Sequence, residues 1–464
     1  MAAVQTDAPA TVRVGEPLTL FNAAIIINNV YQQNLEPTQG GYIPKRIANK
    51  LRQQLKGLEL LDGDGIDARL ELMLRALQEL GVLHLSEPVF EKEKPMYEPG
   101  PVMEVWSRLE MVWQARQLLS RWATAPYWTG ITGANFQPPP GYQYNLNPRA
   151  GRGFFLQYLA DSAQADVWYD ISSILKDIHK QEPTLMRSNY NFLTKKQREQ
   201  FAKNSQAWMQ VEGEIYIGMI MGALFEMGVV DLGYEEAGLT FDDKTRINPT
   251  AMRLNEFGNQ VIKAFPTNET DGRQIAEKLL KEITTAVANP ARKFIIQPNF
   301  DLLLLEPDMP SLYSVLPFVQ LKQIGQSSTL QITQNALLRG MRYGLSVNAI
   351  IEILETRCKN DVPQNIDYSL RDWAKQYREA VISQVYLIEV PEALTDSLAA
   401  HEKLQKQGVQ KIAPGVLAVT IDSDLNALKN ILEKEKIVVH TKGSFFVTDE
   451  EDDDDDDDDF YHYR

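Results

Sequence analysis

The chain has 464 residues, enough for about three domains at roughly 100–200 residues each. Its single cysteine, Cys358, excludes a disulfide framework and a cysteine-based zinc site. The formal net charge is −15, but eleven of the acids lie between residues 449 and 459. Without these eleven acids, the chain has 51 acidic and 47 basic residues. Because the rest of the chain is nearly neutral, the acidic tail does not exclude nucleic acid as a partner.

The first residues lack the basic region and the apolar stretch of a signal peptide, so we expect a cytoplasmic protein. The most apolar helical stretch, residues 215–230, is too short to span a bilayer and contains Glu226. A buried core helix is therefore the better interpretation, and we expect no membrane partner.

Taken in chain order, the residue pattern of the first structured part predicts a helical module. An amphipathic helix begins near Pro44, a residue suited to a first helical turn. Its apolar stripe at helical spacing is Ile47, Leu51, Leu55 and Leu58. A second helix ends at Gly81, residues 82–85 follow as a short strand, and residues 102–122 form a third helix.

The second part predicts helices, then a two-stranded ribbon, then a closing helix. The strands are residues 229–232 and 251–254, and Asn255 is suited to cap the helix over residues 256–264. This order is the one expected of a winged helix. The third part predicts a strand pair broken at residues 298–299. It continues with helices over 335–343, 346–357 (with Ser346 as cap) and 366–377, and a strand over 381–390.

These elements predict an α+β, predominantly helical fold of tandem winged-helix modules, a third α/β domain and a small α/β appendix. The expected divisions are residues 1–17 (disordered), 18–130 (first, winged-helix-like module), 131–160 (Pro/Gly-rich linker), 161–265 (second winged helix), 266–292 (connecting helix), 293–390 (third domain), 391–447 (appendix) and 448–464 (acidic disordered tail).

Catalytic patterns are missing from the sequence. It contains no phosphate-binding G-x-x-x-x-G-K-[ST], no H-E-x-x-H and no G-x-S-x-G, and its five histidines are scattered singly. Cys358 lies on a predicted helix between Arg357 and Lys359, where a lowered thiol pKa is conceivable, but a passive helical cysteine is the better interpretation. We expect no enzyme activity, no cofactor, no metal and no small-molecule substrate.

Two basic stretches are candidates for nucleic-acid binding. The helix after Pro44 places Lys45, Arg52 and Lys56 on one side, with Arg46 and Lys50 on a flank and no acid before Glu59. The second stretch interleaves cations with Tyr190 and Phe192, which suits stacking on unpaired bases. Its cations are Arg187, Lys195, Lys196, Arg198 and Lys203. A solvated helix face and a loop pinned by its aromatics are the alternatives.

The wing between the two strands, residues 233–250, carries Lys244 and Arg246 but also four acids, so a protein-docking wing is as consistent with it as a DNA contact. The acidic tail imitates the charge of a nucleic-acid strand, and a solubilising role is the alternative. Its aromatic end, residues 460–464 (FYHYR), is unusual for a segment that only aids solubility.

Several ordered motifs indicate a family. Residues 294–300 (FIIQPNF), 332–337 (ITQNAL), 350–355 (IIEILE) and 370–373 (LRDW) resemble the N-terminal domain of the XPB-type helicases. The upstream part, with residues 253–258 (RLNEFG), is similar to prokaryotic proteins that carry this domain behind helix-turn-helix modules; it lacks their usual Thr-Pro helix start.

The resemblance implies an accessory protein without a motor. In the XPB helicases this domain precedes the motor lobes, which are missing here, and a relative occurs in the TFIIH subunit that clasps XPB. By this analogy, which comes from fold alone, the chain would bind DNA or dock a helicase or ATPase partner. The alternative is a pure protein–protein scaffold whose winged helices never touch DNA.

Overall fold

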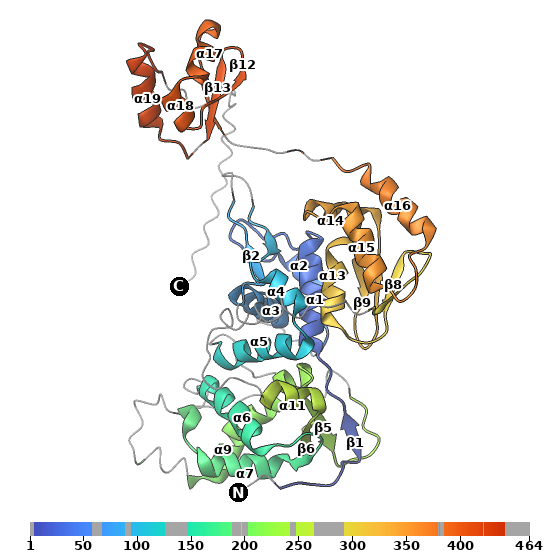
Figure 1. The fold of residues 1–464 in the computed structure, drawn as a ribbon. Helices are drawn as coiled ribbons and strands as arrows, with labels where there is room; N and C mark the ends of the chain where they lie inside the picture. Colours follow the sequence, from blue (N-terminus) through green and yellow to red (C-terminus); the bar gives the residue numbers. More distant parts are fainter. Residues whose placement is uncertain are drawn as a thin grey trace, which may run out of the picture. The chain divides into compact units, whose positions relative to one another are not determined.

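The computed structural model describes residues 4–57, 67–88, 94–125, 147–187, 196, 203–241, 247–263, 292–378, 380, 385–420 and 422–440. They form two compact units, divided between Arg378 and Glu379. The fold is a mixed α/β arrangement, about half helical, with small sheets (Figure 1). None of the described helices is both long and apolar enough to cross a membrane.

The first part of unit 1 is helical, with one short antiparallel ribbon. Its elements are β1 (Thr11–Arg13), α1 (Leu18–Tyr31), α2 (Lys45–Arg52), α3 (Ala68–Glu79), β2 (Leu83–Leu85), β3 (Tyr97–Pro99), α4 (Met103–Arg108) and α5 (Met111–Thr124). Strands β2 and β3 pair with each other. The helix predicted over residues 102–122 is two helices, because Leu109 takes an extended backbone conformation between them.

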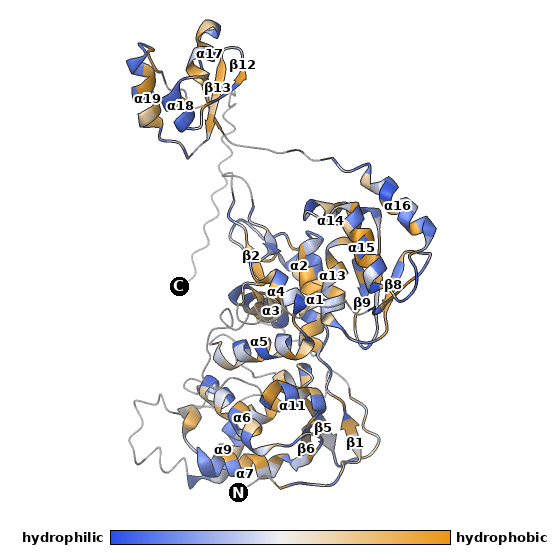
Figure 2. Ribbon diagram, in the orientation of Figure 1, coloured by the Kyte–Doolittle hydropathy of each residue, from blue (hydrophilic) through white to orange (hydrophobic). Residues whose placement is uncertain are grey.

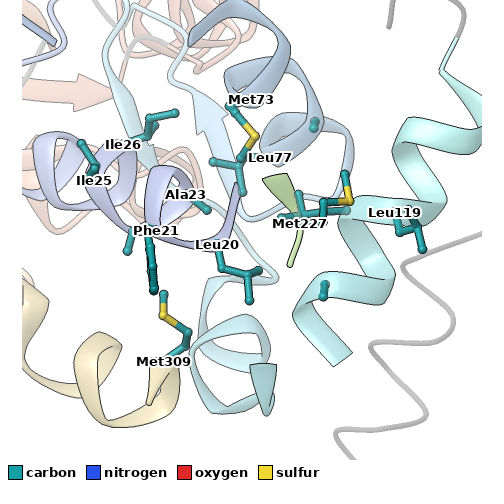
Figure 3. Close-up of a cluster of buried hydrophobic side chains, with 14 of the residues drawn as sticks. Leu20, Phe21, Ala23, Ile25, Ile26, Met73, Leu77, Leu119, Met227 and Met309 are labelled. Carbon is teal, nitrogen blue, oxygen red and sulfur yellow. The ribbon is translucent and has the colours of Figure 1, made fainter. Parts of the chain in front are cut away.

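Helix α1 is apolar on nearly every side, and all of its residues after Leu18 are buried. A helix of this kind is stable only inside a core. Figure 3 shows Phe21 of α1 pointing toward Met309, whereas Met73 of α3 lies on another side of the helix. The sequence analysis did not identify α1, although it is the element around which unit 1 packs.

The second part of unit 1 combines helices with a four-stranded sheet of order β1-β5-β6-β4, whose neighbours are all antiparallel. Its elements are α6 (Pro148–Ser162), β4 (Trp168–Asp170), α7 (Ile171–Gln181), a 3-10 turn (Leu185–Arg187), α9 (Ser205–Trp208), α10 (Glu214–Met219) between π-helical turns (Met209–Gly213 and Ile220–Leu224), β5 (Val230–Tyr234), β6 (Ala251–Leu254) and α11 (Glu256–Lys263). The predicted cap of α11 is confirmed, because Asn255 Oδ1 accepts a hydrogen bond from Gly258 N at 2.7 Å.

Two predictions about irregular segments are wrong. Residues 1–17 were expected to be disordered, but β1 adds an edge strand to β5, and the Arg13 guanidinium stacks on Phe225 and Phe241. The linker expected over 131–160 contains most of α6. Asn147 caps this helix and Pro148 opens it, so residues that indicate a loop also supply its start. Residues 131–146 lie outside the described part.

The third part of unit 1 contains a sheet of order β7-β8-β10-β9 and its helices. The elements are β7 (Phe294–Ile296), β8 (Asp301–Leu304), α13 (Met309–Val315), a 3-10 turn (Leu316–Phe318), β9 (Gln320–Gln323), β10 (Ser328–Gln331), α14 (Gln334–Arg342), α15 (Val347–Arg357) and α16 (Gln364–Ala374). The strand pair, the three helices and the Ser346 cap were predicted and are confirmed, with Ser346 Oγ accepting from Ala349 N at 3.1 Å. The predictions missed α13, β9 and β10.

Unit 2 is a small two-layer domain with its own apolar core. It consists of β11 (Val385–Glu389), α17 (Glu392–Ala399), α18 (Glu402–Lys406), β12 (Gln410–Ala413), β13 (Val416–Thr420) and α19 (Leu425–Lys434). Strand β13, orange in Figure 2, is the central strand of the order β11-β13-β12. Because β11 pairs with β13, the strand predicted over 381–390 belongs to this unit and not to the domain before it.

The first three parts do not separate into independent modules. One continuous cluster of buried apolar side chains runs from Leu20 to Leu370. The predicted connecting helix over 266–292 and the acidic tail over 448–464 lie, except for Arg292, outside the described residues. Unit 1 is therefore one body in which the predicted divisions at 130 and 160 have no counterpart.

A buried carboxylate joins the N-terminal segment to the sheet. Asp231 on β5 is 1% exposed. Its Oδ1 accepts from Gly15 N at 2.9 Å and from Asn255 Nδ2 at 3.3 Å, and its Oδ2 accepts from Arg253 Nε at 2.8 Å. A carboxylate with this many donors is stabilising because each donor would otherwise lose its partner.

We expect Asp231→Ala to lower the free energy of unfolding of unit 1 by about 2–3 kcal/mol, because Arg253 and two amides lose their acceptor. All seven tryptophans precede residue 379, so the urea midpoint of tryptophan fluorescence reports on unit 1. Asp372→Ala, which removes only an exposed pair with Lys375, is the control and should leave the midpoint almost unchanged. Equal midpoints for both variants would contradict the role of Asp231.

Candidate nucleic-acid interface

Helix α2 presents cations on one face and apolar residues on the other. Ala48 and Leu51 are buried, and Leu55 is buried in the turn that follows. Lys45, Arg46 and Lys50 are exposed. The helical period places Arg46 and Lys50 opposite the buried Ala48 and Leu51, whereas Lys45 lies at the side of the helix in its first turn. The amphipathic helix was predicted correctly in type. The exposed trio, however, includes Arg46 and Lys50, which were expected only on a flank.

The remaining two cations of this stretch are less exposed. Helix α2 ends at Arg52, and both Arg52 and Lys56 are half-buried. Their position follows from the way in which residues 53–57 turn back toward α1 and α3. The part of the interface that faces solvent is therefore Lys45, Arg46 and Lys50, called the α2 cation face below.

Two asparagines of α1 bind the turn that follows α2. Asn22 Oδ1 accepts from Lys56 N at 2.7 Å, and Asn22 Nδ2 donates to Lys56 O at 3.0 Å. Two turns further along α1, Asn29 Nδ2 donates to Gln54 Oε1 at 3.1 Å. Both asparagines are 4% exposed, so these hydrogen bonds satisfy polar groups that could not reach water.

A buried ion pair extends this attachment to α3. Asp67 caps α3 by accepting from Arg69 N at 2.9 Å, and its carboxylate also binds the Arg69 guanidinium, with Oδ2 2.5 Å from Nη2. The other guanidinium nitrogen, Nη1, donates to the carbonyl oxygens of Lys56 and Gly57 at 2.7 and 2.6 Å. The residues that follow α2 are thus hydrogen-bonded both to α1, through Asn22 and Asn29, and to α3, through Arg69. The helix therefore has a defined position on the core.

All of the charged side chains of α2 are positive. Within the described part of the chain, Lys45, Arg46 and Lys50 have no carboxylate at ion-pair distance, and α2 itself contains no acid. Lys50 and Arg52 lie in the last turn, where the helix dipole favours cations. Such a face is suited to bind phosphates, which release their counterions when lysine or arginine neutralises them.

A pocket of about 550 Å³ opens beside the same helix. It lies between the turn that precedes α2, the outer side of α3 and Tyr97 of β3. Its lining is Gly41, Tyr42, Ile43, Ala48, Ala68, Leu70, Glu71, Leu72, Leu74, Arg75, Gln78 and Tyr97. Tyr42, one of the lining residues, is 73% exposed, so the pocket presents an aromatic side chain to solvent.

The second predicted basic stretch is described only in part. Lys196 and Lys203 are exposed, and Arg187 ends the 3-10 turn that follows α7. Lys195 and Arg198 lie outside the described residues, as do Tyr190 and Phe192. The wing cations Lys244 and Arg246 lie outside them too. The predicted binding role of this stretch and of the wing stays a prediction.

Cys358 is not a reactive thiol. Its side chain is completely buried, and burial raises the pKa of the thiol to about 12. The neighbouring backbone explains the burial: Lys359 N donates to Phe294 O at 2.7 Å, so this segment lies along the edge of β7. The passive cysteine is the correct interpretation, and the lowered pKa considered from the adjacent cations is wrong.

Sequence reasoning found the cations of α2 but missed the residues that position them. Asn22 and Asn29 stand seven residues apart in a segment whose other residues, apart from Asn28, are apolar, and this spacing places them on one side of a helix. That spacing is a usable signal for a buried polar contact. The pairing of Asp67 with Arg69 and the pocket had no signal of comparable strength. Among the described residues, no three histidine, cysteine, aspartate or glutamate side chains are grouped as metal ligands.

One comparison places part of the chain in a wider context. Residues 294–413 match a family described as the helicase conserved C-terminal domain. The match begins at β7, covers the third part of unit 1 and continues into β12 of unit 2. The chain therefore carries a helicase-related segment. No curated protein matches the chain.

We expect Asn22→Ala to lower the free energy of unfolding of unit 1 by about 1–3 kcal/mol, because Lys56 N loses its side-chain acceptor and Lys56 O keeps only the Arg69 guanidinium. Urea unfolding followed by tryptophan fluorescence measures this. Asn49→Ala, an exposed asparagine on α2, is the matched control and should change stability by less than about 0.5 kcal/mol. If the two variants unfold at the same urea concentration, Asn22 does not anchor α2.

We also expect Cys358 to resist alkylation in the folded protein. The thiolate is the reactive form, and a pKa of about 12 leaves very little of it at pH 8. Iodoacetamide at pH 8 should label the chain only after urea exceeds the unfolding midpoint, which intact mass measures. Rapid labelling of the native protein would show that the thiol is accessible and ionised.

Proposed function

We propose that this chain is a non-catalytic, cytoplasmic accessory protein that binds DNA through the α2 cation face and docks a helicase or ATPase partner. The observation that carries the proposal is the α2 cation face itself: three exposed cations without an acid, on a helix fastened to its core by Asn22 and Arg69. A helix whose backbone is already in place loses only side-chain entropy when it binds phosphate.

The order of elements supports winged-helix modules. The described residues within 148–263 follow the order helix α6, strand β4, helix α7, the helical run from α9 through α10, strands β5 and β6, and helix α11. Strands β4, β6 and β5 are adjacent and antiparallel. Helices α1 to α3 followed by the ribbon β2–β3 have a similar order. In helix-turn-helix proteins one helix of the module enters the DNA groove while another crosses the backbone, so α2 is placed where phosphate contact is expected.

The helicase-related segment supports the second half of the proposal. A segment of this family on a chain whose sequence lacks a phosphate-binding loop fits a protein that assists a motor supplied by another chain. The XPB-like character of residues 293–390 remains part of this proposal. No cofactor, metal or small-molecule substrate enters it.

A purely protein-binding scaffold is the second candidate, and α3 favours it. This helix precedes the ribbon, as a DNA-recognition helix does, yet it exposes Glu71 and Glu79 beside Arg75. Mixed charge is a poor match for the DNA backbone and a good one for a protein surface. The two candidates differ in whether the α2 cation face contributes to binding DNA.

The test is fluorescence anisotropy with labelled single-stranded, duplex and forked DNA at several salt concentrations. We expect the variant Lys45→Glu, Arg46→Glu, Lys50→Glu to bind at least tenfold more weakly than the unaltered chain. The slope of log affinity against log salt should fall by about 2–3, since each phosphate contact contributes roughly 0.7–0.9.

The control variant, Lys403→Glu, Lys429→Glu, Lys434→Glu, changes the net charge equally on α18 and α19 of unit 2. It separates a local contact from a general charge effect, and its affinity should stay close to that of the unaltered chain. Equal weakening by both variants would contradict a specific role of α2. Absence of DNA binding at low salt would favour the scaffold, and recovery of an ATPase from nuclease-treated native extract would then support it.

A further inference from the structure

Residues 4–13, called the N-terminal strap below, hold both edges of the sheet formed by β4, β5 and β6. At one edge the strap contributes β1, which pairs with β5 so that Arg13 lies opposite Leu232 (Figure 1). At the other edge Thr6 N donates to Trp168 O on β4 at 3.0 Å. Sheet edges present unpaired backbone groups that invite a further strand. One segment of the chain therefore fills two places at which another strand could add.

Three aromatic rings lie around the side chain of Arg13. Its guanidinium carbon is 4.8 Å from the centroid of the Phe225 ring and 4.7 Å from that of the Phe241 ring. The Tyr234 ring stands beside Phe241, with 4.7 Å between the ring centroids. Burial raises the pKa of Tyr234, and the neighbouring charge of Arg13 opposes this rise. A planar guanidinium that stacks on aromatic faces is the side chain that such a site selects.

The strap covers aromatic side chains without being buried itself. Phe225 and Tyr234 are buried, whereas every residue from 4 to 13 is exposed or half-buried. The main attachments of the strap are backbone hydrogen bonds and the stacking of Arg13. A segment with few buried contacts and exposed hydrogen bonds opens at a small fraction of the global free energy of unfolding. Opening of the strap therefore leaves the sheet folded and uncovers the β5 edge and its aromatic rings.

The contacts of the strap define what else can bind at the β5 edge. The main chain must be extended and antiparallel to β5, as β1 is. Thr11 Oγ1 donates to Glu236 O at 2.7 Å, so a hydroxyl two residues before the arginine is favoured. The ring of Pro9 packs on Gly233, where an added Cβ would stand 2.5 Å from Pro9 Cγ, so this close crossing requires a glycine. Addition of a strand to a sheet edge is a recurring mode of peptide recognition, in which backbone bonds give affinity and side-chain sites give selectivity.

We propose that the β5 edge and the rings of Phe225, Tyr234 and Phe241 form a docking surface for an extended, arginine-containing segment of a partner protein. The strap is the built-in ligand that this segment displaces. A tethered strap has an effective concentration on the order of millimolar, so only a partner that binds tightly, or that is held nearby by a second contact, opens it. A second copy of the chain offers only an identical strap, which makes the same contacts without the advantage of the tether. The inference does not depend on the proposed function, because neither DNA nor the α2 cation face takes part in it.

Hydrogen exchange followed by mass spectrometry tests this displacement in the full chain. The probe is a synthetic peptide with the sequence of residues 4–16, made with heavy isotopes so that its fragments are distinguishable from those of the chain. At millimolar peptide, residues 4–13 of the chain should exchange at least about tenfold faster, whereas residues 230–234 keep their protection because the peptide replaces the strap. A peptide with alanine in place of the arginine should leave both regions unchanged.

The variant Arg13→Ala weakens the strap and makes the test more sensitive. Residues 230–234 should then lose protection, and the arginine-containing peptide should restore it at about a tenfold lower concentration than displacement in the unaltered chain requires. Arg149→Ala removes an exposed arginine of α6 and is the matched control, which should behave as the unaltered chain does. Adding Phe241→Ala to Arg13→Ala should abolish the effect of the peptide. Tryptophan fluorescence checks that each variant is folded.

Three results would overturn the proposal. Equal effects of the arginine and alanine peptides would show that the aromatic rings select no side chain. Failure of the peptide to protect residues 230–234 in the Arg13→Ala chain would show that the β5 edge accepts no added strand. Dimerisation of the unaltered chain at micromolar concentration, reversed by the peptide, would assign the surface to a second copy. Because DNA is absent from these measurements, their outcome is separate from that of the DNA-binding test.

Discussion

The burial of α1 is the interaction on which unit 1 depends. Its consecutive isoleucines, Ile25 to Ile27, are each at most 3% exposed, and full burial of such a side chain stabilises by about 1.5–3 kcal/mol. Because the helix is apolar around its circumference, no single neighbour can cover it. It contacts α3, α5, α13 and the ribbon strand β3, elements far apart in the chain. Covering one helix from several sides therefore makes one body from parts that the sequence suggests are separate.

The polar residues of α1 give this body its specificity. Asn22, Asn28 and Asn29 are all buried, and a buried amide is costly unless it is hydrogen-bonded. Asn22 meets this requirement through the backbone of Lys56, and Asn29 through the Gln54 side chain. An apolar residue at position 22 would leave Lys56 N without its side-chain acceptor, so Asn22 favours this placement of the segment that follows α2. The cations reach solvent on a helix whose position is determined by buried hydrogen bonds.

Local patterns predicted local structure well and long-range structure poorly. The caps at Asn255 and Ser346 and the basic face of α2 depend on residues close in sequence, so their signals were sufficient. Helix α1 was missed because a helix that is buried all round has no polar side and hence no periodic pattern to detect. The start of α6 was mistaken for a linker because proline and asparagine open helices as readily as they form turns.

The same distinction applies to the candidate interface. Lys45, Arg46 and Lys50 are visible as a cluster because they lie within six residues of one another. Arg69, held by Asp67, donates to Lys56 and Gly57 across a stretch of chain, and nothing in its local sequence indicates this contact. The pocket depends on the packing of α3 against the turn before α2 and on β3, which no local pattern describes. Positioning residues are harder to predict than the charges they position, since their partners are set by the fold.

The helicase-related segment is tied to the same core, and this limits how a partner can use it. Helix α13 packs on α1, Tyr343 meets Tyr31 edge-to-face at a ring distance of 5.0 Å, and Arg342 Nη1 donates to Gln33 Oε1 at 2.6 Å. That side of the segment is committed to unit 1. Another side, such as α16, where Tyr368 is 70% exposed, stays open to solvent. Because α16 and α2 belong to one compact unit, the proposed docking of a partner at the first would hold it in a defined relation to the proposed nucleic-acid site at the second.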